Sequence, residues 1–382
     1  MKLLHLADLH IGKRVNGFSM LEDQSYILNQ IIDIVDNQQP DAVLIAGDVY
    51  DKPVPAADAV QLLDDFLVQL SRRHVQVCMI SGNHDSAERI AFGGRLMSAS
   101  GIHLAPVYHG AIEPVTLTDS FGSVHIYLIP FLRPANVRHF HADTEINSYT
   151  NAMRTVIENI SFSPAARNVA VVHQFVTGSG IQPETCESEE HTVGGLDQVD
   201  ASVFAPFDYV ALGHLHGPQK IGRDTIRYGG SPLKYSFSEV NQKKSVTIIT
   251  MQEKGCMDIH QIPLRPKRDM ELLRGAFASL TAPDFLQAHD TQNYFKITLT
   301  DEEDIPNALT RLRECYPNMM LLEYDNKRTR AHADILGADH TEQKSPLQLF
   351  DELYEKQNGQ PMSDAQRTFT MQLIREIWED ME

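Results

Sequence analysis

The chain has 382 residues, which is more than one domain usually contains, so a large domain with smaller additions is expected. Its hydrophobic fraction of 42% fits a globular protein, and no apolar run approaches the ~20 residues that a membrane-spanning helix needs. The net charge of −18 argues against an overall basic surface of the kind that commonly binds nucleic acids.

The start of the chain and its cysteines both indicate a cytoplasmic protein that does not enter a membrane. Met1 leads within a few residues to His5 and Asp8, and no apolar signal-peptide core or cleavage site intervenes. The four cysteines are widely separated and form no C-x-x-C pair. Free thiols are therefore expected rather than disulfides.

Residues 1–262 alternate short apolar runs with helical patterns, which is typical of an α/β domain whose functional residues gather at strand ends. Apolar spacing predicts helices over 23–37 and 56–70. Strands are expected over 2–7, 41–46, 75–81, 125–131, 168–172, 208–212, 225–228 and 245–251.

One segment of this domain, 177–202, lacks apolar periodicity and contains an acidic cluster from Glu184 to Glu190. Long segments without secondary structure are uncommon in compact domains and are usually functional. A long loop beside the functional site is therefore expected here.

The alternation fades after Pro263, which predicts a small α+β capping domain over 263–330. Its expected elements are a helix over 270–280, a strand over 294–299, a helix over 305–315 and a strand over 319–324. Residues 331–344 are polar and aperiodic, which is typical of a linker.

Two helices are predicted within residues 345–382. Ser345 begins the first, with Gln348 three residues later, and Ser363 begins the second, with Gln366 three residues later. The pattern alone leaves open whether the pair packs on its own domain or docks into a groove of a partner. The apolar positions expected to make the contact are Leu347, Phe350, Leu353, Phe369, Leu373, Ile377 and Trp378.

Five polar motifs of the first domain follow apolar runs, in the order D-x-H, G-D, G-N-H-D, a lone H, and G-H-x-H. Carboxylate, amide and imidazole groups at strand ends are suitable ligands for the divalent metals used in phosphoryl transfer. Seven such groups suffice for two metal ions roughly 3.5 to 4 Å apart. The predicted ligands are Asp8, His10, Asp48, Asn83, His173, His214 and His216.

The spacing within these motifs supports shared ligation. In a D-x-H or H-x-H segment the two side chains lie on the same face of an extended chain. Gly47 relaxes the turn before Asp48, which is expected to bridge the two metals. A single histidine of this kind is usually an ordinary polar residue, but the complete ordered set is far more specific. Asp8 and His10 are expected at the first metal, with Asn83 and His173 toward the second.

These motifs resemble the calcineurin-like metallophosphoesterase superfamily over residues 1–262. The resemblance implies an α/β sandwich of two β-sheets flanked by helices, with a dinuclear metal site. Within the superfamily, GNHD at 82–85, FLRP at 131–134, VGGLDQVDASVF before the GHLH motif and RYGGSPLKYSFSE after it resemble the Mre-type DNA repair nucleases.

The resemblance to Mre-type nucleases implies a Mn²⁺-dependent enzyme of DNA repair, recombination and replication. It would be an exonuclease on double strands and an endonuclease on single strands, including hairpins. It also implies an SMC-type ATPase partner docked on the C-terminal helices, a homodimer within a heterotetramer, and a cytoplasmic, nucleoid-associated location. The alternatives are a two-metal phosphomonoesterase of small molecules or proteins, and a metal-stabilised scaffold without catalysis.

His84 is the expected general acid, because it neighbours a ligand and its imidazole titrates near neutrality. Asp51 is expected to orient and charge-stabilise it, although a loop-capping role is the alternative. Many Mre-type nucleases carry histidine at this position, so the chain departs from that branch here. Asp85 is either an outer partner of a ligand or a turn residue.

Several basic residues follow the motifs and are possible DNA contacts, although each is also consistent with an ordinary surface charge. With a net charge of −18, a local basic patch and the ATPase partner are expected to hold the DNA. The basic residues concerned are Lys13, Arg14, Arg89, Arg95 and Arg133.

Overall fold

The computed structural model describes residues 1–178, 182–189, 197–303, 305–327, 345–358 and 360–381. The linker predicted over 331–344 lies outside the described residues, as do the side chains of Ile377 and Trp378.

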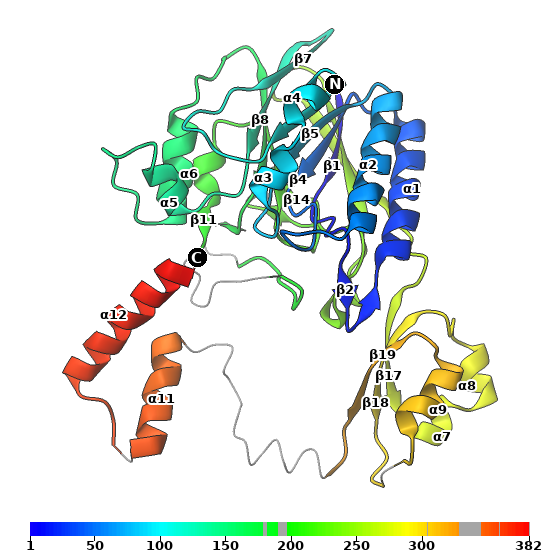
Figure 1. Ribbon diagram of the computed structural model, residues 1–382. Helices are drawn as coiled ribbons and strands as arrows, with labels where there is room; N and C mark the ends of the chain where they lie inside the picture. Colours follow the sequence, from blue (N-terminus) through cyan, green and yellow to red (C-terminus); the bar gives the residue numbers. More distant parts are fainter. Residues whose placement is uncertain (179–181, 190–196, 304, 328–344, 359, 382) are drawn as a thin grey trace.

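Two six-stranded sheets form the centre of the large domain (Figure 1). The first has the order β16-β15-β1-β4-β5-β6, in which β1, β4, β5 and β6 are parallel. The second has the order β13-β14-β12-β9-β8-β7, in which β14, β12, β9 and β8 are parallel. The first sheet comprises β1 (Lys2–Leu6), β4 (Ala42–Ala46), β5 (Gln76–Ile80), β6 (Ile102–Ala105), β15 (Ser245–Met251) and β16 (Met257–Pro263). The second comprises β7 (Val115–Asp119), β8 (Gly122–Ile129), β9 (Arg167–His173), β12 (Tyr209–Gly213), β13 (Lys220–Ile221) and β14 (Arg223–Tyr228).

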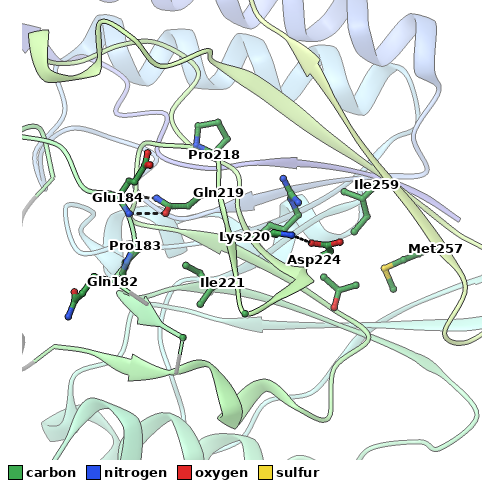
Figure 2. A pocket seen from close by; sticks show the side chains of 14 residues that line it. Gln182, Pro183, Glu184, Pro218, Gln219, Lys220, Ile221, Asp224, Met257 and Ile259 are labelled. Carbon is green, nitrogen blue, oxygen red and sulfur yellow. Dashed lines mark hydrogen bonds and ion pairs between the residues drawn. The ribbon is translucent and has the colours of Figure 1, made fainter. Parts of the chain in front are cut away.

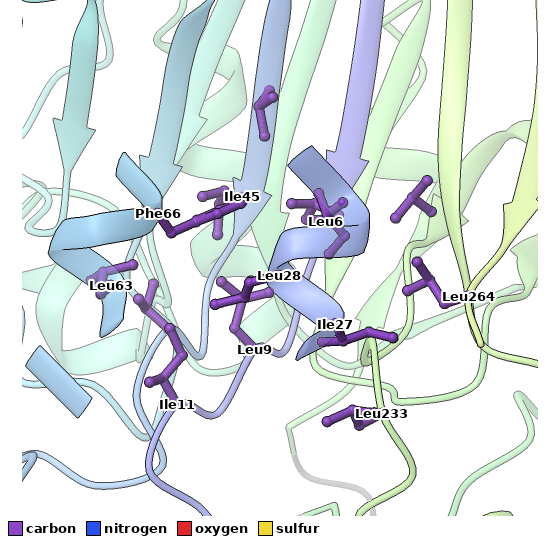
Figure 3. Packing of buried hydrophobic residues seen from close by; sticks show 14 of the residues in the cluster. Leu6, Leu9, Ile11, Ile27, Leu28, Ile45, Leu63, Phe66, Leu233 and Leu264 are labelled. Atoms are coloured by element: carbon purple, nitrogen blue, oxygen red, sulfur yellow. The ribbon is translucent and has the colours of Figure 1, made fainter. Parts of the chain in front are cut away.

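Three apolar layers hold this domain together. One lies between the sheets and joins residues of β1 and β4 to residues of β9 and β12. A second lies between the first sheet and helices α1 (Leu21–Gln38) and α2 (Ala57–Arg72), where Phe66 lies beside Ile45 (Figure 3). The third packs α6 (Tyr149–Glu158) on the outer face of the second sheet. The predicted sandwich of two sheets flanked by helices is therefore confirmed.

The sequences of the central strands fit sheets that are covered on both faces. Every residue of β4 and β9 is buried, as expected for central parallel strands covered on both faces. The eight predicted strands and the two predicted helices of this domain are all present, with ends shifted by a few residues. Sequence reasoning missed strands β6, β7, β13 and β16, helix α6, and the short helices α3 (Ala87–Ala91), α4 (Gly94–Ser98) and α5 (Pro134–Arg138).

Short elements complete the large domain. Within the loop predicted over 177–202, residues 182–189 have no helix or strand, but the ends of the predicted range contribute to the strand pair β10 and β11. The remaining elements are β2 (Arg14–Val15), β3 (Phe18–Ser19), β10 (Val176–Thr177), β11 (Val199–Asp200), and the 3₁₀ turns η1 (Ala201–Phe204) and η2 (Phe237–Glu239).

The helix predicted over 270–280 is wrong in its first half. Met270–Gly275 forms strand β17, which pairs in parallel with β18 (Tyr294–Leu299), and only α7 (Phe277–Leu280) is helical. Met270 and Leu273 are buried, so their three-residue spacing imitates a helix face, but sheet pairing decides the local structure. The predicted strands at 294–299 and 319–324 are confirmed, and the predicted helix over 305–315 is present as α9. The other elements here are α8 (Pro283–Gln287), α9 (Ala308–Cys315) and β19 (Met319–Tyr324).

Helices α11 (Pro346–Asn358) and α12 (Asp364–Met381) form a C-terminal hairpin, red and orange in Figure 1. Both predicted N-terminal signals are confirmed: the Ser345 N–H donates to Gln348 Oε1 at 2.7 Å, and the Ser363 N–H donates to Gln366 Oε1 at 2.9 Å. Gln366 also donates to the Tyr354 hydroxyl. None of the described helices is long and apolar enough to cross a membrane.

Candidate metal centre

The predicted ligands converge on one end of the sandwich from both sheets. Asp8 and His10 follow β1, Asp48 follows β4, and Asn83 follows β5, three adjacent parallel strands of the first sheet. In the second sheet His173 ends β9, and the G-H-x-H motif follows its neighbour β12. Carboxyl ends of parallel strands meet at the same edge, which is why motifs so distant in sequence come together.

Three ligands form a first group. His10 Nε2 lies 3.1 Å from His216 Nε2, and these two residues have ligand atoms within 4.8 Å of one another and of Asp8. All three side chains are buried. Two imidazole nitrogens that face each other at this distance could both bind one cation.

A second group gathers around the Asn83 amide oxygen. That oxygen lies 2.9 Å from His173 Nε2 and 3.1 Å from His214 Nδ1. The structure thus brings the asparagine that follows β5 of the first sheet together with the histidines at the ends of β9 and β12 of the second sheet.

The Asp48 carboxylate lies between the two groups. Its Oδ2 atom is 3.6 Å from His10 Nε2 and 3.4 Å from His173 Nε2. Its Oδ1 atom accepts the backbone N–H of His84 at 3.0 Å. This is the geometry that a bridging carboxylate requires.

The chemistry of the donor set fits divalent cations. The His173 Nδ1–H donates to the Ala46 carbonyl at 2.8 Å, so Nε2 is left facing the oxygens of Asn83 and Asp48. Oxygens can only accept, so this position calls for a proton or a metal. Asp8 Oδ2 and His10 Nδ1 are buried and have no hydrogen-bond partner within the described part of the chain.

Electrostatics at the centre follow from burial and from the crowding of carboxylates. Burial lowers the pKa of His173, but the adjacent Asp48 and Asp8 outweigh it and raise that pKa to about 9. Burial also raises the pKa of Asp8 well above its ordinary value and lowers that of His10 well below it. Asp48 is held well below its ordinary pKa, because neighbouring histidines outweigh the effect of burial.

The backbone at the ligands is strained. Asp8, His10, Asp48 and His214 have φ of 52°, 44°, 45° and 107°, in the left-handed region that non-glycine residues rarely adopt. Such conformations persist only when the surroundings hold them, and they gather at functional sites.

Two glycines leave the space that the ligands occupy. A Cβ atom at Gly82 would lie 2.0 Å from Asp48 Oδ1, and one at Gly47 would lie 2.4 Å from His173 Nδ1. Gly47 also has a φ of +80°, so the glycine before Asp48 is needed for both reasons.

Comparison with known proteins places the chain in a family. A model of the calcineurin-like phosphoesterase family matches residues 1–218, more than half of the chain. The curated D subunit of the SbcCD nuclease from Staphylococcus epidermidis (strain ATCC 12228 / FDA PCI 1200) is 31% identical over 371 residues, which cover 96% of each chain. The chain belongs to the SbcD family of calcineurin-like phosphoesterases.

Three further similarities cover parts of the chain. A model described as "Type 5 capsule protein repressor C-terminal domain" matches residues 266–358. YfcE, a phosphoesterase from E. coli, is 13% identical with a TM-score of 0.27, covering 65% of this chain and 88% of its own. A dimetal phosphatase from Danio rerio is also 13% identical, with a TM-score of 0.41 and coverage of 70% and 98%. TM-scores this low imply nothing about the site.

His84 and Asp51 are neighbours in this member of the SbcD family, but they meet through the backbone. His84 Nδ1 lies 3.1 Å from the Asp51 carbonyl oxygen, and its Nε2 lies 3.9 Å from Asp48 Oδ2. The Asp51 carboxylate accepts from Lys13 Nζ at 2.7 Å and lies 3.8 Å from His10 Nδ1. The contacts of this carboxylate therefore point toward Lys13 and His10 rather than to the expected dyad with His84.

Asp85 organises the loops that carry the ligands. Its carboxylate accepts the backbone N–H groups of Val49, Tyr50 and Gly82 at 3.0, 2.9 and 2.9 Å. Burial and the nearby Asp48 raise its pKa to about 6. Of the two roles left open by the sequence, the contacts match the turn-stabilising one.

Some of the basic residues predicted to contact DNA already have partners within the protein. Lys13 is engaged by Asp51 and lies over the Tyr235 ring, 5.6 Å from its centroid. Arg14 donates to the Gly17 carbonyl within its own hairpin. The remaining residues, Arg89, Arg95 and Arg133, lie on or beside helices α3, α4 and α5.

Sequence reasoning missed the residues behind His216. Ser188 Oγ lies 2.7 Å from His216 Nδ1, and the His216 backbone N–H donates to Glu189 Oε1 at 2.5 Å. Ser188 also contacts Glu239, a buried residue of η2. The acidic cluster of the predicted loop was the available signal, and its expected position beside the site is correct.

A separate pocket of about 910 Å³ opens between the β13–β14 hairpin and edge strand β16 (Figure 2). Lys220 and Asp224 form an ion pair of 2.6 Å on one side, and Met257 and Ile259 line the other. Its described lining contains none of the seven predicted ligands, so the metal centre lies outside it.

Proposed function

We propose that the chain is a Mn²⁺-dependent DNA nuclease that hydrolyses phosphodiesters as the SbcD component of an SbcC/SbcD-type complex. It would act as an exonuclease on double strands and an endonuclease on single strands, including hairpins, in DNA repair, recombination and replication. The observation that supports the proposal is the convergence of the six other predicted metal ligands around Asp48 in a member of a nuclease family.

We propose that the predicted ligands hold two cations. Asp8, His10 and His216 would hold the first, and Asn83, His173 and His214 the second, with Asp48 shared. Oxygen and imidazole ligands without thiolate suit Mn²⁺. When bound, such cations polarise the phosphate and supply a nucleophilic water at neutral pH.

His84 would supply the proton for the leaving group. Its Nδ1–H donates to the Asp51 carbonyl, because a carbonyl can only accept, so Nε2 is directed toward the metal centre. The side chain is 14% exposed, so substrate can reach it. As the bond from phosphorus to the leaving oxygen breaks, the protonated Nε2 gives its hydrogen to that oxygen. Asp51 thus acts as a positioning residue for His84 through its backbone.

Substrate binding has to overcome the net charge of −18. We propose that Arg89, Arg95 and Arg133, beside the short helices that follow two of the motifs, contact the DNA backbone. Lys13 would add positive charge near the bound DNA without breaking its ion pair with Asp51. The ATPase partner and the second copy would supply the rest of the DNA-binding surface.

The assembly would use two further surfaces. We propose that 1–262 is the nuclease domain, 263–330 a capping domain and 345–382 a docking module for an SbcC-like ATPase. On the docking module, Phe350, Leu353 and Phe369 are 45%, 51% and 64% exposed, as partner-binding residues should be. Phe92 and Leu96, at α3–α4, are 85% and 82% exposed, and we propose that they form the homodimer contact within a heterotetramer.

The experiment that tests the function compares substrates. Purified protein with Mn²⁺, with and without the ATPase subunit, is incubated with linear duplex, a DNA hairpin, single-stranded circles and p-nitrophenyl phosphate. Mn²⁺-dependent degradation of duplex and opening of hairpins is expected. Monoester hydrolysis without cleavage of any DNA would instead establish a phosphomonoesterase and overturn the proposal.

A further inference from the structure

The imidazole of His216 is contacted on both sides. Its Nε2 atom faces the metal centre, 3.1 Å from His10 Nε2. Its Nδ1 atom lies 2.7 Å from Ser188 Oγ, in the segment 182–189 that the large domain folds against η2. Which ring nitrogen carries the hydrogen decides whether Nε2 can bind a cation, and the partner of Nδ1 sets that choice.

Glu239 is the fixed end of this chain of contacts. Its Oε2 atom accepts from Lys244 Nζ at 2.5 Å. Its Oε1 atom accepts the Tyr235 backbone N–H at 3.1 Å and lies 2.6 Å from Ser188 Oγ. Both oxygens are therefore surrounded by donors, and the carboxylate of this fully buried residue acts only as an acceptor.

Lys244 is itself held in place. Its ammonium is buried and donates to the His216 carbonyl at 2.9 Å, to Ser231 Oγ at 2.9 Å and to Gln242 Oε1 at 2.7 Å. A buried charge with this many acceptors is fixed in position. The charged partner of Glu239 therefore contacts the backbone of the same histidine whose ring the carboxylate reaches through Ser188.

These contacts fix the donor and the acceptor in each hydrogen bond between Glu239, Ser188 and His216. A serine hydroxyl has one hydrogen, and Ser188 gives it to the acceptor-only Glu239. Toward His216 the Ser188 oxygen can then only accept, so the hydrogen of the neutral ring must be on Nδ1. The Nε2 atom keeps its lone pair and directs it into the metal centre. Cys186 Sγ, 3.2 Å from Ser188 Oγ, is likewise left to donate.

The same segment also holds the His216 backbone. The His216 N–H donates to Glu189 Oε1 at 2.5 Å, and Glu189 Oε2 accepts the Cys186 N–H at 2.8 Å. The segment is fastened to η2 by a hydrogen bond of 3.0 Å from the Glu187 N–H to Ser238 Oγ. Ring and backbone of His216 are thus oriented by consecutive residues, Ser188 and Glu189.

We propose that Ser188 is a positioning residue which, backed by Glu239 and Lys244, fixes the Nδ1–H tautomer and the orientation of His216. The segment 184–189 thereby sets the affinity of the cation position formed by Asp8, His10 and His216. This inference rests on the metal-dependent function proposed above, because it concerns one of its two metal positions. Ser188 itself contacts neither cation nor substrate.

The test measures Mn²⁺ binding by titration calorimetry on the full chain after treatment with EDTA. Wild type should bind two Mn²⁺ ions, and Ser188→Ala should bind one of them about 10- to 100-fold more weakly. Ser188→Thr, which keeps the hydroxyl, should restore the affinity. Ser236→Ala is the matched control, because it removes a hydroxyl 3.2 Å from the same Glu239 oxygen without touching His216. Melting temperatures in EDTA should agree among these proteins.

Glu239→Gln gives a second, spectroscopic readout. The glutamine amide can donate to Ser188, which frees the serine hydrogen for His216 Nδ1 and moves the ring hydrogen to Nε2. ¹⁵N spectra of histidine-labelled, metal-free protein should then show the opposite tautomer for one ring, identified by its absence in His216→Gln. An unchanged tautomer in Glu239→Gln, or unchanged binding of both ions by Ser188→Ala, would overturn the inference. A wild type that binds no Mn²⁺ would instead refute the proposed function.

Discussion

His84 is partly exposed, as Asn83 is, whereas the other six predicted ligands are buried. Replacing it with alanine removes the proposed proton donor but no metal-binding atom. We expect His84→Ala to keep both Mn²⁺ ions and to lose about 10²- to 10⁴-fold in the rate of duplex degradation. The rate of duplex cleavage is measured under single-turnover conditions, and the number of bound Mn²⁺ ions is measured by titration of the same preparation.

The control for this variant is His74→Ala, a histidine at the end of α2 and outside the metal centre, which should leave both quantities unchanged. If His84→Ala cleaves DNA at the wild-type rate, His84 has no part in proton transfer.

His173 makes the metal-free protein sensitive to pH. Its pKa of about 9 in the fold exceeds the ordinary 6.5, so its bound proton stabilises the metal-free fold below about pH 6.5. That stabilisation is lost as the pH rises through 9, while Mn²⁺ affinity increases because the competing proton leaves. Melting temperatures in EDTA should therefore fall from pH 6.5 to 9, and His173→Asn should flatten this trend. Parallel trends for the two proteins would contradict the assignment.

At the scale of single residues, the sequence indicates the candidate ligands but not the residues that hold them in place. Asp8-x-His10 and His214-x-His216 carry their own spacing signal, and each follows an apolar run that becomes a strand. The acidic cluster marks the segment that contains Ser188, but neither Ser188 nor Glu239 carries a spacing signal, because their contact with each other depends on how two irregular segments fold together. The positive φ at the ligands is equally invisible in sequence, since aspartate and histidine do not require it.

The short helices α3 and α4 present apolar surface where a second copy would dock. Phe92→Asp combined with Leu96→Asp places charges on the two most exposed large hydrophobic side chains of the described residues. We expect the double variant to be monomeric where the wild type forms the proposed homodimer, as measured by sedimentation at a fixed concentration. Phe121→Asp, in the β7–β8 turn and 49% exposed, is the control. A mass that the double variant leaves unchanged would place the dimer contact elsewhere.

The C-terminal hairpin is tied together by its own contacts, including an ion pair of 2.6 Å between Arg367 and Asp351. A chain ending at residue 344 should therefore keep Mn²⁺-dependent nuclease activity and lose binding to the ATPase subunit in a pull-down. Binding retained without 345–382 would refute the docking role. A milder change, Phe369→Ser, should weaken binding and leave the helices intact.

Elements of the first domain were predictable because each central strand is a continuous apolar run, as in β4 and β9. Edge strands were not: β16 alternates half-buried and exposed residues, which is also typical of a solvated loop. The error at Met270–Gly275 has the same origin, since pairing with β18 is a non-local contact that local spacing does not reveal.

At the scale of the whole molecule, the proposed capping domain contacts the large domain at α1. The buried carboxylate of Asp23 accepts from Arg268 at 2.7 Å and from the Tyr294 hydroxyl at 2.8 Å. Arg268→Ala leaves this carboxylate with one partner fewer, and we expect a loss of about 2 kcal/mol of stability. Urea denaturation checks this value. Arg274→Ala, which removes an ion pair 61% and 29% exposed, should cost less than about 1 kcal/mol. Equal losses would show that the junction has no special weight.

The strand ends that form the metal centre come from two different sheets, and this has a mechanical consequence. Each proposed cation takes ligands from both: Asp8 and His10 reach it from the first sheet and His216 from the second, while Asn83 faces His173 and His214 in the same way. The bound cations would therefore link the two sheets at this edge of the sandwich. Metal binding would hold the sheets together as well as supply the chemistry, and removing the metals with a chelator would weaken the contact between the sheets at this edge first.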